Sequence, residues 1–254
     1  MINPSPDIIW AATLGILGAL IGSFISTAIV RWRTDSPIIL DRSRCDSCAR
    51  NLKPFELVPI LSAAAFQFRC RTCHARIKSI HPLIETAACL IGLLAGIAAP
   101  GTQAIGGALF GWQLLALAAL DIRHFLLPNA LTAGLAATGF AASLAGLGPT
   151  PTDSLLGGLA GFGSLWSVRK AYRLMRGREG LGGGDPKLFG GIGFWLGWYA
   201  LPYVLLSSSV LGLAIAAIRL WRDPNFATDR PIPFGAYLAL GAFPAWLTIA
   251  AAGN

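Results

Sequence analysis

Residues 189–218, FGGIGFWLGWYALPYVLLSSSVLGLAIAAI, contain no charged side chain. The run is longer than the roughly 20 residues that one α-helix needs to cross a bilayer core. Only Pro202 and Ser207–Ser209 interrupt its apolar character, so we expect two helices to meet near residue 204. A transmembrane β-strand would instead alternate polar and apolar residues. The run therefore predicts helices inside a membrane.

The rest of the chain has the same character. Of its 254 residues, 54% are hydrophobic and only 13% are charged, and the mean hydropathy is +0.61. Eight apolar windows are candidates for crossing the bilayer: residues 8–30, 80–99, 103–120, 126–147, 154–168, 187–204, 204–220 and 234–251. We expect an all-α polytopic membrane protein with about eight transmembrane helices. The start MINPSPD lacks the basic region of a cleavable signal peptide, so we expect the first helix in the mature protein.

The basic residues predict the orientation. All 20 Lys and Arg residues fall on one side of an eight-helix arrangement, half of them in the loop 31–79, while the opposite loops AAPGTQ and GLGPTPTDS have none. Because cytoplasmic loops hold the excess of Lys and Arg, we expect this loop in the cytoplasm and both termini outside. The net charge of +8 then lies against anionic lipid. No aromatic-interleaved basic groove indicates a nucleic-acid partner.

The loop 31–79 contains two Cys-x-x-Cys pairs. Each pair can supply two corners of a tetrahedron around zinc, and the four candidate ligands are Cys45, Cys48, Cys70 and Cys73. His74 and His81 are alternative ligands. Two disulfides are a second interpretation, but a cytoplasmic loop lies in a reducing compartment. Four thiolates leave no open position, so we expect a structural zinc in a small cytoplasmic insert.

The chain thus divides into a first transmembrane helix, residues 1–30, the zinc-binding loop, 31–79, and a membrane-embedded region, 80–254. Cys89 lies in an apolar helix and is expected to serve packing.

Three acids border or enter the predicted spans. Asp121 closes the third helix and Asp185 opens the sixth, so both are expected at the cytoplasmic end of the bilayer, where they can act together. Alternatives are a helix N-cap for Asp185, a surface pair with Arg123 for Asp121, and a structural anchor or interhelical hydrogen bond for Glu85.

Glycines precede Asp185 in EGLGGGDPKLFGG, residues 179–191. Glycines there let a second backbone approach closely, as a peptide substrate would need, and Gly182 and Gly184 are the candidate substrate-binding residues. The segment is not a phosphate-binding loop, because its Lys follows a proline and no Ser or Thr comes next. The G-x-x-x-G spacings Gly18/Gly22, Gly107/Gly111, Gly157/Gly161 and Gly193/Gly197 are typical of close helix packing.

Together these segments resemble the prepilin peptidase family, the type IV leader peptidases, which belong with the G-x-G-D membrane aspartyl proteases. The resemblance covers nearly the whole chain: the cysteine loop ending in HPLIE, then LDIRHFLLPNALT, EGLGGGDPKLFGGIGFWLGW and PIPFGAYLALG.

The resemblance implies that Asp121 and Asp185 are the catalytic pair of an aspartic endopeptidase in the bacterial inner membrane. It also implies the partners: precursors of type IV pilins or type II secretion pseudopilins, cut on the cytoplasmic side just before an apolar helix. Many members then N-methylate the new terminus with S-adenosylmethionine. In the region associated with methyl transfer, this chain departs from the family pattern at Asp46-Ser47, Val58-Pro59 and Phe68-Arg69, where members often have proline, asparagine and glycine respectively.

Two carboxyls held close together cannot both ionise easily, so one keeps a proton while the other activates water. Because Asp185 begins a helix and Asp121 ends one, the helix dipole favours Asp185 as the base and Asp121 as the acid. Two rival functions remain. A presenilin-type or signal-peptide-peptidase-type protease would lack the zinc loop, and a transporter using both aspartates as an ion relay is typically built from an inverted repeat, which we do not find.

Overall fold

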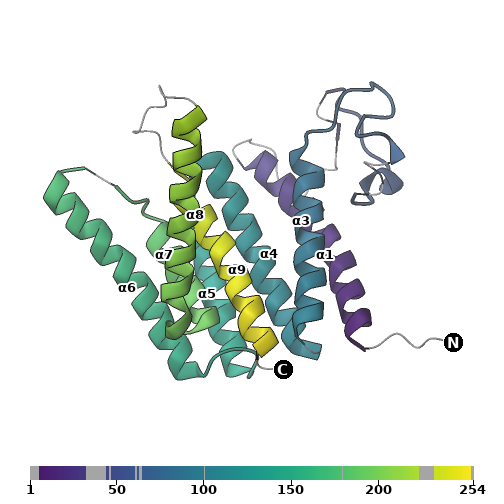
Figure 1. Ribbon diagram of the computed structural model, residues 1–254. Helices are drawn as coiled ribbons and strands as arrows, with labels where there is room; N and C mark the ends of the chain where they lie inside the picture. The colour runs from purple at the N-terminus through teal and green to yellow at the C-terminus, as the bar shows by residue number, and fades with distance from the viewer. Residues whose placement is uncertain are drawn as a thin grey trace. The chain divides into compact units, whose positions relative to one another are not determined.

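The computed structural model describes residues 6–32, 44–45, 47–60, 62, 65–99, 101–178, 180–222 and 232–252 (Figure 1). In these ranges eight α-helices occur: α1 (Pro6–Arg31), α3 (Ile80–Ala98), α4 (Gly101–His124), α5 (Asn129–Leu144), α6 (Pro151–Arg176), α7 (Asp185–Leu196), α8 (Leu201–Arg222) and α9 (Phe234–Ala252). Two short 3-10 helices are η1 (Pro54–Leu57) and η2 (Trp198–Ala200). Extended pairing among these residues is limited to two isolated bridges. The all-α expectation is confirmed.

Five of the described helical segments are long and apolar enough to cross a bilayer: residues 8–31, 80–98, 101–124, 198–222 and 234–252. Of the other three, α5 and α7 have only 16 and 12 residues. Helix α6 has 26 residues, but its last turns are basic. The protein is therefore a multi-pass membrane protein whose remaining helices are short or partly polar.

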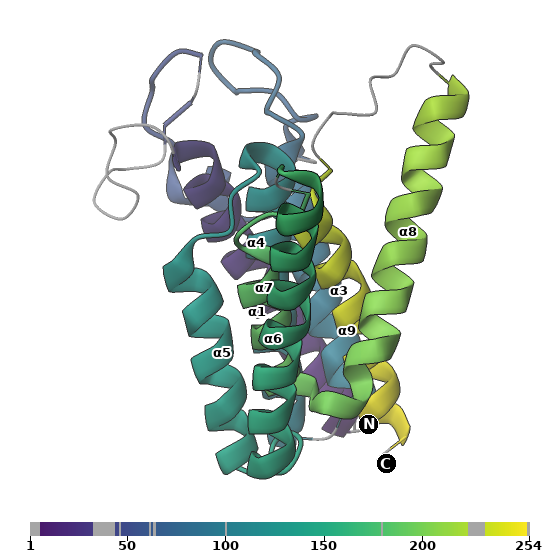
Figure 2. The ribbon, with the colours of Figure 1, turned by 90° about the vertical axis from the view of Figure 1, so that its left-hand side faces the viewer.

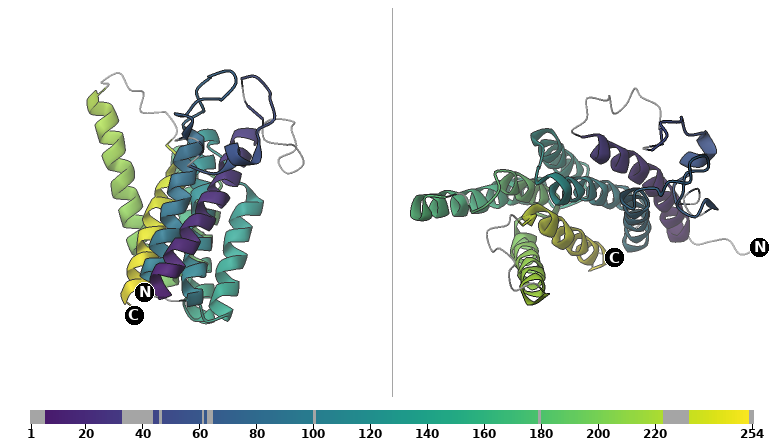
Figure 3. Two further views of the ribbon diagram at one scale, coloured as in Figure 1. Left: turned by 90° about the vertical axis from the view of Figure 1, so that its right-hand side faces the viewer. Right: turned by 90° about the horizontal axis from the view of Figure 1, so that it is seen from above.

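The chain packs as two compact units, residues 1–112 and 113–254, with α4 contributing to both. In the first unit α1 and α3 run antiparallel along each other, and the loop between them lies where α1 ends and α3 begins (Figure 3). Glycines allow this approach, because a methyl group added at Gly22 would lie 2.7 Å from Cα of Glu85. The expected packing role of the Gly18/Gly22 pair is confirmed.

In the second unit α7 is the central helix. Ten of its twelve residues are buried, and it contacts α5, α6 and α9 (Figure 2). Helix α6 lies against it through glycines: a methyl group on Gly161 would come within 2.6 Å of the carbonyl oxygen of Phe189, and Gly157 meets Gly193 directly. The packing expected for Gly157/Gly161 is confirmed, and it fixes the helix that Asp185 begins.

The helix boundary expected near residue 204 was wrong. Helix α7 ends at Leu196, because Gly197 has φ +77, which ends regular helix, and η2 leads into α8. The hydroxyls of Ser207 and Ser208 donate to the carbonyl oxygen of Val204 at 3.1 and 2.6 Å, so the serines sit inside α8 without a break.

Helix α6 extends well beyond the expected window 154–168. It begins after Thr150, whose hydroxyl accepts a hydrogen bond of 3.2 Å from the backbone N–H of Asp153, and ends at Gly177 with φ +66. Arg, Lys, Leu and Met are good helix formers, so the basic segment 169–176 continues the helix instead of starting a loop.

Candidate active site and metal site

Asp121 and Asp185 come together in the second unit. Their residues are only 6% and 5% exposed. A methyl group built on Gly235, at the start of α9, would lie 3.0 Å from Oδ2 of Asp121 and 3.3 Å from Oδ1 of Asp185. The two carboxyls therefore border the same small space beside Cα of Gly235.

The side chain of Asp121 is held by α9. Its Oδ2 accepts a hydrogen bond of 2.9 Å from the backbone N–H of Ala236, and the N–H of Gly235 also donates to this carboxyl. The first N–H groups of a helix have no partner within it, so Asp121 satisfies donors of another helix. Among the described residues, Asp121 therefore binds the start of α9. The alternative surface pair with Arg123 is not among its contacts there.

Asp185 does not cap its own helix. The N-cap of α7 is Gly184, Asp185 is the first helical residue and Pro186 the second. The N-cap alternative is therefore wrong, and the carboxyl, which accepts from the N–H of Gly182, is available to the space shared with Asp121. Since both carboxyls now lie at a helix N-terminus, the dipole no longer separates an acid from a base.

The two candidate glycines have different surroundings. A methyl group on Gly182 would lie 2.9 Å from Oδ2 of Asp185, so glycine keeps that oxygen uncovered. A methyl group on Gly184 would meet Cβ of Leu127 at 2.5 Å, so this glycine makes room for a packed side chain. The sequence analysis missed a hydrogen bond between the starts of α7 and α5, in which Nζ of Lys187 donates to Oδ1 of Asn129 at 2.6 Å.

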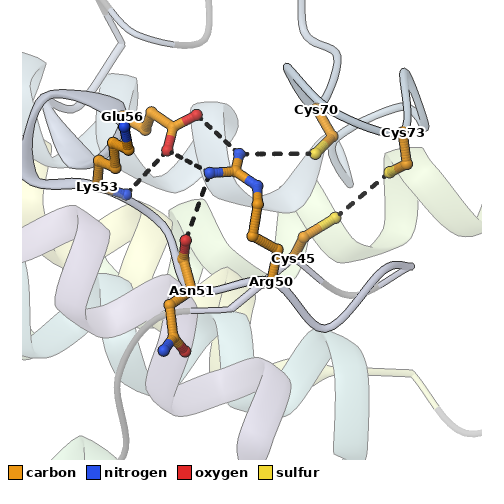
Figure 4. Close-up of polar contacts among 7 residues, drawn as sticks. All are labelled: Cys45, Arg50, Asn51, Lys53, Glu56, Cys70 and Cys73. Carbon is orange, nitrogen blue, oxygen red and sulfur yellow. Dashed lines mark hydrogen bonds and ion pairs between the residues drawn. The ribbon is translucent and has the colours of Figure 1, made fainter.

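The four cysteines of the loop form one cluster, with all Sγ atoms within 4.8 Å of one another. Figure 4 shows three of them, Cys45, Cys70 and Cys73. The Sγ atoms of Cys45 and Cys73 are 3.8 Å apart, close to the edge of a tetrahedron with metal–sulfur bonds of about 2.3 Å. The cysteines are free thiols, so the disulfide alternative is wrong. Neither histidine joins the cluster, and Nδ1 of His81 lies 2.9 Å from the hydroxyl of Ser26. The cluster could hold a metal ion.

The cluster is built from a repeated unit, RCDSCARN at 44–51 and RCRTCHAR at 69–76. In each unit the first cysteine's N–H donates to a carbonyl five residues on, and its carbonyl accepts from a residue with φ +55, Ala49 or His74. The first and last residues of each repeat form an isolated bridge, Arg44 with Asn51 and Arg69 with Arg76. The internal similarity was readable in the sequence and was missed.

Arg50 connects the first cysteine repeat, residues 44–51, to η1. Its guanidinium donates to both carboxylate oxygens of Glu56, at 2.8 and 3.0 Å, and approaches Sγ of Cys70 at 4.0 Å (Figure 4). The hydrogen bonds from Arg50 lower the pKa of Glu56 to about 2. Backbone N–H groups of Cys73 and Thr72 lower the pKa of the Cys70 thiol to about 6, while desolvation and the neighbouring cysteine sulfurs raise the pKa of Cys73 to about 11, so Cys70 is the thiolate of this pair.

The comparisons with known proteins identify one family. The model of the "Type IV leader peptidase family" matches residues 108–217, and that of the "Bacterial Peptidase A24 N-terminal domain" matches 16–99. A "Prepilin leader peptidase/N-methyltransferase" of Aeromonas hydrophila is 38% identical over 211 residues, 83% of this chain and 72% of the relative. Proteins of the same description from Pseudomonas aeruginosa and Pectobacterium carotovorum are 34% and 33% identical, with 88% and 91% of their lengths covered. The chain belongs to the type IV leader peptidase family. No solved structure matches it.

Two residues of this type IV leader peptidase family member, Phe68 and Glu85, shape the cysteine loop and its attachment to α3. Phe68, in the Phe68-Arg69 pair before the second Cys-x-x-Cys, has φ +57, a left-handed conformation that favours glycine. Glu85 is the anchor that sequence reasoning offered, because its Oε2 accepts the N–H of Ile60 at 2.9 Å and ties the loop to α3.

Proposed function

We propose that this chain is an aspartic endopeptidase that removes the basic leader from type IV prepilins or type II secretion pseudopilins. The cut would fall at the cytoplasmic face of the bacterial inner membrane, just before the substrate's apolar helix. The observation that supports it most is the pair of buried carboxyls, Asp121 and Asp185, on either side of one small space. The printed names of the relatives agree with this activity.

The chemistry would need only these two groups and water. Two carboxyls that face one space and are withdrawn from bulk water share a single proton. The ionised one takes a proton from water, whose oxygen attacks the scissile carbonyl carbon, while the other donates its proton to the carbonyl oxygen. The resulting gem-diol collapses when the first carboxyl gives its proton to the amide nitrogen and the second takes one back from a diol hydroxyl, which breaks the C–N bond, releases the amine and restores the pair. We assign Gly182 to substrate binding, since bare glycine at 182 leaves Oδ2 of Asp185 accessible to a peptide backbone, whereas Gly184, the other candidate, makes room for Leu127.

Leader removal tests this function directly. The purified protein, reconstituted in liposomes, would be incubated with a prepilin, and the product would be identified by the mass of its new N-terminus. A prepilin with a disrupted cleavage site serves as the control. We expect loss of the leader alone, and an intact prepilin after prolonged incubation would contradict the proposed function.

We propose that the ion held by the cysteine cluster is zinc, bound by Cys45, Cys48, Cys70 and Cys73. The sulfur-only donor set and the near-tetrahedral spacing fit this metal. With four thiolates the zinc would organise the loop and supply no catalytic position.

We also propose N-methylation of the new terminus, with S-adenosylmethionine as the methyl donor, on the strength of the relatives' names. The unit of residues 1–112 has a cavity of about 230 Å³, and its lining holds arginines and a lysine together with Glu56 and Glu85. The cations suit the carboxylate of the donor and carboxyls suit its sulfonium, but Glu56 is paired with Arg50 and Glu85 binds the N–H of Ile60, so no residue is assigned to methyl transfer. Incorporation of label from S-adenosylmethionine into the cleaved pilin would test this activity separately.

The orientation follows from the basic residues. We propose that the loop 31–79 is cytoplasmic and that both termini are outside. The apolar helices between them would contact membrane lipids. A reporter fused after Asn254, which lies outside the described residues, or inserted at 150–153 should report the non-cytoplasmic face. Cytoplasmic signals at both positions would contradict the arrangement.

A further inference from the structure

We propose that Gly235 and Ala236, at the start of α9, are positioning residues and form the third component of the active site. They would hold Asp121 in place and keep open the space in which both carboxyls meet the reacting atoms. This inference rests on the proposed peptidase function. Neither residue was singled out from the sequence, where PIPFGAYLALG carried only a resemblance.

The N–H groups of α9 carry the first half of the argument. Asp121 approaches α9 from α4 and accepts from Ala236 at 2.9 Å and from Gly235. The N–H of Phe234 is taken up by the carbonyl of Ile232 at 2.8 Å, so these two are the next N–H groups of the helix's first turn. Two donors on one carboxyl fix its orientation, which is what a group that must meet the reacting atoms in one geometry requires.

The missing side chain of Gly235 carries the second half. Any side chain there would come within 3.0 and 3.3 Å of the two carboxyl oxygens, and within 2.8 Å of Cδ1 of Leu127. The glycine is not needed for the backbone, because its φ is outside the left-handed region where glycine is favoured. Space between the aspartates is therefore what the residue provides.

A purely structural cap would behave differently. A helix start needs an acceptor for its N–H groups, but it tolerates alanine at its second position. If α9 served only to close the fold, Gly235→Ala would alter stability and leave the turnover of folded protein unchanged. If α9 positions the dyad, turnover falls while substrate affinity is retained.

The first experiment compares Gly235→Ala with Gly134→Ala in liposomes, because a methyl group at Gly134, on α5 of the same unit, would meet nothing within 4 Å. We expect kcat for leader removal to fall by about 100-fold for Gly235→Ala, with KM and the thermal midpoint near wild type. We expect Gly134→Ala to match wild type. A kcat for Gly235→Ala within about threefold of wild type would overturn the proposal.

A second variant removes only a donor and adds no bulk. Lactic acid incorporated in place of Ala236 replaces the backbone N–H by an ester oxygen, and the same change at Ala130, in the first turn of α5, is its control. We expect about a tenfold lower kcat for the ester at 236 alone. Equal rates for both esters would overturn the role of Ala236. A wild-type protein that leaves prepilin intact would instead refute the proposed function.

Discussion

Asp121 and Asp185 border one space at the start of α9, although α5 and α6 separate their helices in the chain. Each carboxyl accepts backbone N–H groups, Asp121 from α9 and Asp185 from the glycine segment before α7. These contacts make the geometry of the pair depend on where two helices begin, and the charge of Arg169 also acts on Asp185.

Metal content should depend on the four cysteines of the cluster. We expect about one zinc per chain by elemental analysis, and loss of most of it on substitution of any one ligand to serine, because three thiolates hold zinc less firmly than four. Cys89→Ser is the matched control, since Cys89 lies outside the cluster. A quadruple serine variant that retains its zinc and cleaves normally would show that the cluster is incidental.

The Arg50–Glu56 pair should slow metal loss. Because Arg50 holds the pKa of Glu56 at about 2, below its ordinary 4.5, the stabilisation is complete above pH 4.5 and disappears as the pH falls through 2. We expect Glu56→Gln to release metal to a chelator faster than wild type, by the same factor at pH 6 and pH 8. Arg50→Lys should act in the same direction, since lysine cannot form the two-pronged contact, while exposed Arg76→Lys should not. A factor that differs between the two pH values would contradict this explanation.

Glu85 should anchor the loop through hydrogen bonding and not through its charge. Glu85→Ala leaves the N–H of Ile60 without its acceptor, and we expect a loss of about 1–3 kcal/mol in unfolding free energy. Glu85→Gln keeps an acceptor at the same place and should recover most of it. Thermal unfolding in detergent checks both variants, and an equal loss for both would mean that the charge matters.

The α6–α7 contact should tolerate no side chain at Gly161. Gly161→Ala places a methyl group 2.6 Å from a backbone carbonyl, so the helices must separate, and we expect a thermal midpoint lower by several degrees. Gly163→Ala, on the same helix but with nothing within 4 Å, should leave the midpoint unchanged or raise it. Similar midpoints for the two variants would indicate looser packing than the structure has.

Hydropathy located the helices well because apolar length is a direct property of the sequence. It failed at Gly197, where a backbone conformation ends α7 inside an uninterrupted apolar run, and at α6, where basic residues continue a helix that a membrane scale ends early. Both errors come from local backbone preferences that a hydropathy window does not contain.

The sequence also predicted only part of the candidate site. The sequence singled out Asp121 and Asp185 because acids are rare in such spans, and the cysteines because of their spacing. Gly235 and Ala236 act through a missing side chain and a backbone N–H, which leave no chemical signature in a sequence. The dipole argument for separate roles failed because α9, distant in the chain, brings its own N-terminus to Asp121.

Leader removal by Asp121→Asn and Asp185→Asn in liposomes, with zinc content and folding checked, tests the central claim. Asparagine keeps an acceptor for the N–H groups, so both variants should fold, but neither pair can then supply one acid and one base. Asp153→Asn, a half-buried position at the start of α6 whose carboxyl accepts from Trp198, is the matched control, because asparagine keeps that acceptor. We predict cleavage below about 1% of wild type for both dyad variants and near-normal cleavage for the control. Near-normal cleavage by either dyad variant would remove that residue from the pair and contradict the aspartic peptidase mechanism.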